Sequence, residues 1–134
     1  MKFVLASQNV HKQRELQAVL APYGVELLLQ RELGVQIDVD ETGATFAENA
    51  RLKADAALRA TGLPAIADDS GLMVDALGGA PGVYSARYGA PACKTDADRN
   101  EKLLAALQGV PDEARTARFV CALCCALPDG RRIE

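Results

Sequence analysis

Two adjacent carboxylates, Asp68 and Asp69, end an apolar run at residues 65–67 and stand just before Ser70. A helix-stopping Gly-Leu-Pro precedes the run, so residues 65–68 are predicted to form a short buried strand. Acids at the end of a buried strand are costly unless something uses their charge. In a mostly parallel sheet, ligands bind at the carboxyl ends of the strands. Two acids at that position indicate a Mg²⁺ site, and a Mg²⁺ site indicates a substrate with phosphate groups. The plainer alternative is a turn with solvated acids.

A polar turn at residues 7–12 (SQNVHK) follows a predicted strand at residues 3–6 and begins a helix. Backbone N–H groups at a helix start favour anions, and Lys12 adds a compact positive charge suited to a polyphosphate. The glycines of a Walker A loop are missing. Simple N-capping by Ser7 or Asn9 explains the turn equally well.

A second acidic group lies in the loop at residues 31–44 and on the helix that follows it. Its members are Asp38, Asp40, Glu41 and Glu48. Loop acids are usually solvated, and Glu48 is explained by a capping box with Thr45. Lys53 on the same helix could hold a phosphate or orient an acid, or it could be an ordinary exposed lysine.

Length and charge restrict the class of protein. The chain has 134 residues, which suits one domain, and its net charge of −3 comes without a basic run. This argues against broad binding of nucleic acids or anionic membranes, and no apolar run approaches the roughly 20 residues of a membrane span. Because His11 is the only histidine, a nucleophilic triad is poorly supported. Water attack assisted by a metal and a carboxylate fits better.

The cysteines are expected to be structural. They are Cys93, Cys121, Cys124 and Cys125. Three lie in the predicted strand at residues 117–127, where alternation places Cys124 on the face opposite Cys121 and Cys125. That is a poor zinc chelate, so we expect thiols packed in the core and a reducing cytoplasm.

The remaining pattern is that of an α/β protein. Predicted strands are residues 3–6, 25–29, 65–68, 72–74 and 117–127, and predicted helices are residues 11–23, residues 46–60 after Thr45, and a helix after Thr95 with Leu103, Leu104 and Leu107 on one face. Residues 128–130 (PDG) predict a hairpin turn whose return strand starts at Arg131. Since the sequence ends at Glu134, residues 1–134 are expected to be a single domain that lacks its C-terminal part.

Four blocks of sequence combine into a known pattern. They are residues 5–16 (LASQNVHKQREL), 41–50 (ETGATFAENA) with Lys53, 67–72 (ADDSGL) and 78–88 (GGAPGVYSARY). Together they are spread over residues 5–88, and the chain resembles the inosine triphosphate pyrophosphatase-like family, the bacterial XTP/dITP diphosphatases. Each block alone is common, whereas the combination is highly specific.

The resemblance implies a fold and an activity. The fold is α/β, with a long mixed β-sheet flanked by helices and two lobes around a central cleft, usually in a homodimer. The activity is Mg²⁺-dependent hydrolysis of non-canonical purine nucleoside triphosphates (ITP, dITP and XTP) to the monophosphate and pyrophosphate. Its implied role is to clean the nucleotide pool, which is expected in the cytoplasm.

The resemblance also implies roles for individual residues. Asp69 corresponds to the proton acceptor and a metal ligand, and either Asp40 or Glu41 helps to hold Mg²⁺, with Asp68 supporting. The residues implied to contact substrate are Ser7, Gln8, Asn9, Val10, His11, Lys12, Lys53 and Ser70.

The chain departs from the family pattern in two respects. His11 stands where the family often has glycine. The family's Phe-Gly-Tyr-Asp and Ser-His-Arg segments, which help to recognise the base, do not occur before Glu134. The chain is therefore expected to contain the half of the site that binds metal and phosphate, without the half that recognises the base. One alternative to an active pyrophosphatase is a non-catalytic nucleotide-binding fragment. A Maf-like nucleotide pyrophosphatase is another, although that family typically has arginines where Asn9 and Lys12 stand.

Overall fold

The computed structural model describes all 134 residues, which divide into two compact units. One unit comprises residues 1–69 and 122–134, and the other residues 70–121. The resemblance predicted two lobes within one domain; the single domain and the central cleft stay predictions. The helices are α1 (Val10–Leu20), α2 (Phe46–Thr61) and α3 (Asp96–Ala106), with five short 3₁₀ turns between the longer elements.

Five strands form one mixed sheet, in the order β2-β1-β3-β4-β5. They are β1 (Lys2–Leu5), β2 (Glu26–Leu29), β3 (Ala65–Val74), β4 (Ala117–Ala126) and β5 (Arg132–Ile133). Strand β1 pairs in parallel with both β2 and β3, whereas β4 and β5 are antiparallel. The predicted mixed sheet flanked by helices is confirmed.

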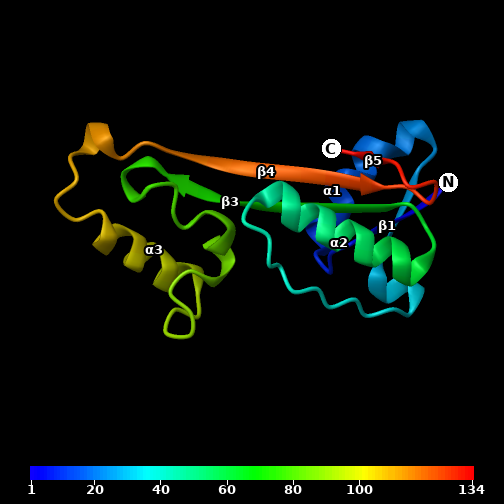
Figure 1. The fold of residues 1–134 in the computed structure, drawn as a ribbon, viewed down its shortest axis with the longest axis horizontal. Coiled ribbons are helices and arrows are strands. Elements are labelled where there is room, and N and C mark those ends of the chain that lie inside the picture. The colour runs from blue at the N-terminus through cyan, green and yellow to red at the C-terminus, as the bar shows by residue number, and fades with distance from the viewer. The chain divides into compact units, whose positions relative to one another are not determined.

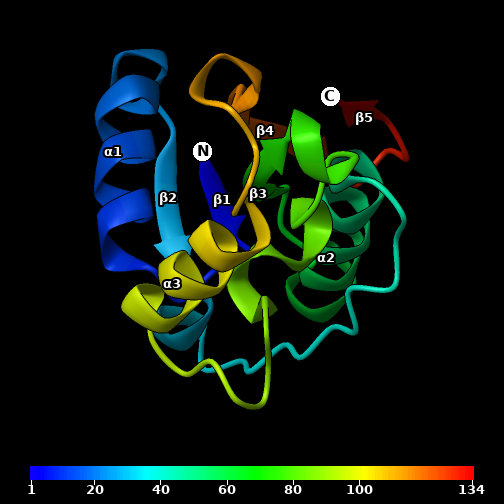
Figure 2. The same cartoon turned by 90° about the vertical axis from the view of Figure 1, so that its left-hand side faces the viewer.

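The core of the first unit has two sides, because alternate residues of a strand face opposite ways. On one side Val4 and Ala65 pack with the alanines of α2. On the other side Leu5 and Leu27 pack with Leu16 and Leu20 of α1. Figure 2 shows α1 and α2 on opposite sides of β1.

Local signals set the helix ends. The Thr45 and Thr95 side chains each accept a hydrogen bond from the backbone N–H three residues later, which caps α2 and α3. Gly62 ends α2 in the left-handed conformation, at φ 71°. Helix α1 is shorter than predicted, because a 3₁₀ turn at Ala21–Tyr23 replaces its last turn before Gly24. The leucines predicted to share one buried face of α3 differ in burial, since Leu107 is buried whereas Leu104 is exposed.

Strand β3 corrects the prediction of a strand that ends at its acids. It runs unbroken from Ala65 to Val74, so Asp68 and Asp69 lie in its middle. The parallel pairing with β1 reaches only Leu5↔Ile66, however. The carboxylates therefore still stand just beyond the carboxyl end of a parallel strand pair, the edge at which α/β sheets bind ligands.

The burial of the cysteines in β4 differs in part from the prediction that they lie in the core. Cys124 is buried beside Ala126 in the core, whereas Cys121 is exposed and Cys125 half-buried. The expectation that every cysteine lies in the core thus holds only for Cys124, because β4 becomes buried only toward its end and Cys93 and Cys125 are half-buried. Phe119, on the same face of β4 as Cys121, is also exposed.

The predicted hairpin is present. Strand β5 returns along β4, with Cys125 opposite Ile133 and Ala126 opposite Arg132. Figure 1 shows this short return arm beside the end of β4. No helix of the chain is both long and apolar enough to cross a bilayer.

A test of this core is the truncation of Leu27, which is 2% exposed, to alanine. Leu27→Ala should lower the free energy of unfolding by about 2–5 kcal/mol, because a cavity remains between β2 and α1. Urea denaturation measures the change. Val19→Ala is the control, since Val19 is 65% exposed and surface changes stay within about 0.5 kcal/mol. Equal losses in both variants would contradict the described core.

Candidate active site

Two carboxylates converge on one ammonium group. Lys53 Nζ lies 3.2 Å from Glu41 Oε1 and 3.3 Å from Asp69 Oδ1. Lys53 comes from α2, Glu41 from the loop before it and Asp69 from β3. Only 19% of the Lys53 side chain is exposed, so the reading of it as an ordinary exposed lysine is wrong.

Asp69 is a buried acid with one oxygen that has no partner. It is 8% exposed, and its Oδ2 has no hydrogen-bond partner within 3.5 Å, although the Asn49 side chain is near enough to act against the rise of the Asp69 pKa. Burial raises the pKa of the Asp69 carboxyl, with the nearby Glu41 charge acting in the same direction, while the Lys53 ammonium opposes the shift. The net pKa lies above the ordinary value of 3.8. A raised pKa in a polar site suits a carboxylate that accepts a proton near neutral pH.

Asn49 is a site residue that the sequence reasoning missed. It is fully buried on the apolar face of α2, its Oδ1 accepts a hydrogen bond from Gly43 N–H at 2.7 Å, and its Nδ2 has no partner. Asn49 and Lys53 stand four residues apart on the face that also carries Phe46, Ala50 and Ala54. Two polar residues at that spacing within a buried stripe were the signal that could have revealed them.

Close packing holds the loop that carries Glu41. A Cβ added at Gly43 would lie 2.6 Å from Asn49 Oδ1 and 2.7 Å from Glu48 Cβ, so only glycine fits. Glu48 accepts a hydrogen bond from Ala44 N–H at 2.7 Å. The predicted capping box is therefore corrected: Glu48 reaches back one residue further than Thr45, and it fastens the loop.

The adjacent acids of β3 face different helices. Even-numbered residues such as Ile66 pack on the α1 side and odd-numbered ones such as Ala67 on the α2 side. Asp68 accordingly pairs with Lys12 of α1, whose Nζ lies 3.0 Å and 2.8 Å from its two oxygens. Asp69 pairs with Lys53 of α2. Each acid thus has its own cation.

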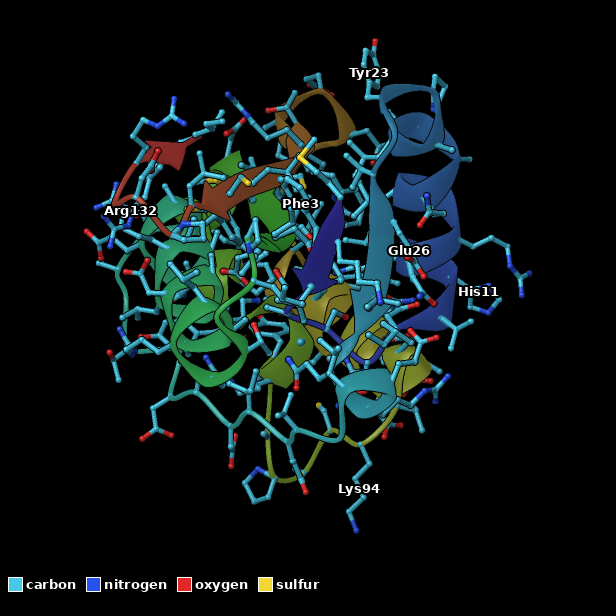
Figure 3. The ribbon with its side chains drawn as sticks, turned by 90° about the vertical axis from the view of Figure 1, so that its right-hand side faces the viewer. Phe3, His11, Tyr23, Glu26, Lys94 and Arg132 are labelled. Atoms are coloured by element: carbon cyan, nitrogen blue, oxygen red, sulfur yellow. The ribbon has the colours of Figure 1, made fainter.

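The turn before α1 is held by its own side chains. Asn9 Oδ1 accepts hydrogen bonds from the N–H groups of His11 and Lys12, and Ser7 Oγ accepts one from Asn9 N–H. The capping interpretation therefore holds for Asn9, and the phosphate contact stays a prediction. His11 is exposed, and Figure 3 shows it on the outer side of α1.

The other predicted site residues are dispersed. Asp40 is exposed, its backbone carbonyl accepts a hydrogen bond from Thr42 N–H, and its side chain does not share the Lys53 ammonium with Glu41 and Asp69. A cavity beside Glu41 and Lys53 is also lined by Gln30, Asp38 and Val39. Gln8 donates to Gln30 at 3.4 Å. Ser70 lies in the second unit, where it lines a separate cavity with Ser85 and Arg99.

The donor set around Asp69 fits Mg²⁺. The ion prefers oxygen ligands and is usually held by one or two carboxylates together with substrate phosphates. Glu41 and Asp69 supply two carboxylates that already converge on a cation, and Asp69 Oδ2 is a buried oxygen without a partner. No three or more His, Cys, Asp or Glu side chains gather into a metal cage. Mg²⁺ bound together with phosphates does not require such a cage.

Comparison with known proteins agrees with this architecture. The sequence profile of the Ham1 family matches residues 3–134. The chain belongs to the Ham1 family. The dITP/XTP pyrophosphatase of Yersinia pseudotuberculosis is 60% identical over 122 residues, which are 91% of this chain and 61% of that relative. The chain thus spans about 61% of the length of this curated relative.

Solved Ham1 structures have the same fold. The Ham1 protein of Staphylococcus aureus superposes with a TM-score of 0.89 at 41% identity, over 99% of this chain and 67% of that one. The HAM1 protein of Coxiella burnetii gives 0.86 at 46% identity, over 93% of this chain and 62% of that one. The resemblance inferred from the four sequence blocks is confirmed, and it favours this family over a Maf-like protein.

The buried Asp69 carboxyl predicts a pH-dependent stability. Below the ordinary pKa of 3.8 the group is protonated in both the folded and unfolded chain. As the pH rises, the unfolded chain loses this proton first, so the raised folded pKa costs stability. The stability of Asp69→Asn relative to the unmodified chain should therefore increase from pH 4 to pH 7. Chemical denaturation with a chelator present measures the difference, and a decrease would mean that the folded pKa is depressed.

Proposed function

We propose that the chain carries the metal- and phosphate-binding half of a Mg²⁺-dependent nucleoside triphosphate pyrophosphatase. Its substrates are the non-canonical purine nucleotides ITP, dITP and XTP, and its products are the monophosphate and pyrophosphate. The observation that carries the proposal is the convergence of Glu41 and the buried Asp69 on one cation, beside a cavity, in a Ham1 chain. The name of the Yersinia relative, dITP/XTP pyrophosphatase, supports this substrate class.

Asp69 is proposed to accept the proton of the attacking water. Oxygen attack at the α-phosphorus forms a new P–O bond, the bond to the bridging oxygen breaks, and pyrophosphate leaves. The raised pKa of Asp69 suits this role, because a base with a pKa closer to the working pH holds the proton better. When bound, Mg²⁺ supplies Lewis acidity that reduces the negative charge of the polyphosphate.

Glu41, rather than Asp40, is proposed as the second metal ligand. The Glu41 carboxylate lies 3.2 Å from the ammonium that Asp69 also contacts, whereas Asp40 is exposed and forms no ion pair with Lys53. The sequence pattern alone could not distinguish these two adjacent loop acids.

The turn at residues 7–12 is proposed to bind the polyphosphate. Lys12 is the strongest candidate, because its ammonium lies at the ligand edge of the sheet, held by Asp68. Ser7, Gln8, Asn9, Val10 and His11 are proposed to contact substrate through this turn. Ser70 stays a proposed substrate contact from the family resemblance. Lys53 is proposed to contact a phosphate as well.

A homodimer in the cytoplasm is proposed from the family resemblance. The half-buried or buried thiols of Cys93, Cys124 and Cys125 accord with a reducing compartment.

The carboxylate roles are tested by pyrophosphate release from ITP with Mg²⁺. Asp69→Asn should lower kcat by about 100-fold or more, the scale of general base catalysis. Glu41→Gln should raise the Mg²⁺ concentration needed for half-maximal rate, and Asp40→Asn, its matched control, should not. Full activity of Asp69→Asn would remove it from the mechanism. Tight ITP binding without turnover by the unmodified chain would instead support a non-catalytic nucleotide-binding fragment.

Lys12→Met tests the phosphate contact. It should raise the KM for ITP roughly 10- to 100-fold, the equivalent of one charged hydrogen bond worth about 1.5–3 kcal/mol. Lys2→Met removes the same charge from an exposed position on β1 and should leave KM unchanged. Steady-state kinetics at saturating Mg²⁺ measures both variants, and equal KM values would rule out the contact.

A further inference from the structure

Lys53 occupies the point at which two proposed metal ligands meet. Its Nζ lies 3.2 Å from Glu41 Oε1 and 3.3 Å from Asp69 Oδ1. A divalent cation held by the same two carboxylates would compete with the ammonium for their negative charge. Lys12 differs, because its ammonium pairs with Asp68 alone and lies on the other side of the sheet.

Glu41 and Asp69 need a cation between them whether or not a metal ion is bound. Asp69 is 8% exposed and Glu41 half-buried, so two carboxylates close together without a counter-charge would be strongly unfavourable. Lysine is suited to supplying a removable charge, since its ammonium is a compact charge on a flexible four-carbon stem. Asp69 Oδ2 already lacks a partner, so the ammonium satisfies only part of this carboxylate.

We propose that Lys53 is a placeholder cation, which neutralises Glu41 and Asp69 in the metal-free protein and must leave both when a divalent cation binds. The inference rests on the assignment of these two carboxylates as metal ligands in the proposed function. Metal binding is therefore a competition, and the intrinsic metal affinity of the site is lowered by its own lysine.

The competition links metal and phosphate binding. With its two carboxylates taken by the metal, the Lys53 ammonium is released on a flexible stem beside the cavity that it lines. A free ammonium there attracts anionic oxygens, so metal binding should strengthen the binding of a polyphosphate. The lysine would serve as counter-ion to the acids first and to the substrate afterwards.

The test is a titration of the chain with Mn²⁺, without substrate, in which electron paramagnetic resonance reports the free ion. Lys53→Met should bind Mn²⁺ roughly tenfold more tightly than the unmodified chain, because one competing charge is removed from a partly screened site. Lys53→Arg keeps the charge and should show no such gain. Arg51→Met is the matched control: it removes a positive charge from the same helix, but Arg51 pairs with Glu134 and not with the site.

Thermal unfolding supplies a second readout. Without metal, Lys53→Met should unfold at a lower temperature, because Glu41 and Asp69 then repel each other. Added Mn²⁺ should raise its Tm by more than it raises that of the unmodified chain. If Lys53→Met does not fold, Lys53→Gln, which keeps a hydrogen-bond donor for the carboxylates, should give the same signs.

The outcomes separate this inference from the proposed function. Loss of Mn²⁺ binding in Asp69→Asn, together with unchanged or weaker binding in Lys53→Met, would overturn the placeholder role and leave the metal site intact. Equal Mn²⁺ binding by the unmodified chain, Asp69→Asn and Glu41→Gln would overturn the metal assignment and the placeholder role with it. Tighter binding in Lys53→Met but not in Arg51→Met or Lys53→Arg would establish the role.

Discussion

The structure around the ligand edge depends on keeping two partly buried carboxylates neutralised. Glu41 and Asp69 share one ammonium, and that arrangement requires α2 to approach the sheet closely. Three fully buried alanines, Ala50, Ala54 and Ala57, allow this approach because their side chains are small. The alanine-rich sequence of α2 therefore does more than favour a helix: it brings Lys53 within reach of a strand residue that a bulkier helix face would keep away.

The alternation of strand β3 explains how two neighbouring acids serve different purposes. Because successive side chains point to opposite faces, Asp68 turns toward α1 and Asp69 toward α2. Both oxygens of Asp68 accept hydrogen bonds from Lys12, so both already have a partner. Asp69 keeps one oxygen without a partner. Asp68 is thus saturated by one cation, whereas Asp69 keeps an oxygen that a further ligand could reach.

Sequence reasoning succeeded where the physical cause is local. The caps at Thr45 and Thr95 and the stop at Gly62 act within a few residues, and they were predictable from residue type alone. The unbroken length of β3 was not, because its acids are neutralised by lysines 16 and 56 positions away. The choice between Asp40 and Glu41, and the part played by Asn49, likewise depend on tertiary contacts. The resemblance identified the family, but it could not give the direction in which each side chain points.

Gly43 is constrained in a different way from Gly24, Gly34 and Gly62. Gly24, Gly34 and Gly62 have positive φ and open space around them, so a substitution there meets backbone strain without a collision. Gly43 has no such torsion, and its constraint is volume alone, because Asn49 and Glu48 fill the space a side chain would take. Under random mutagenesis, position 43 should therefore accept no other residue unless Asn49 or Glu48 changes with it. This includes asparagine and aspartate, which glycine positions with a left-handed backbone do accept.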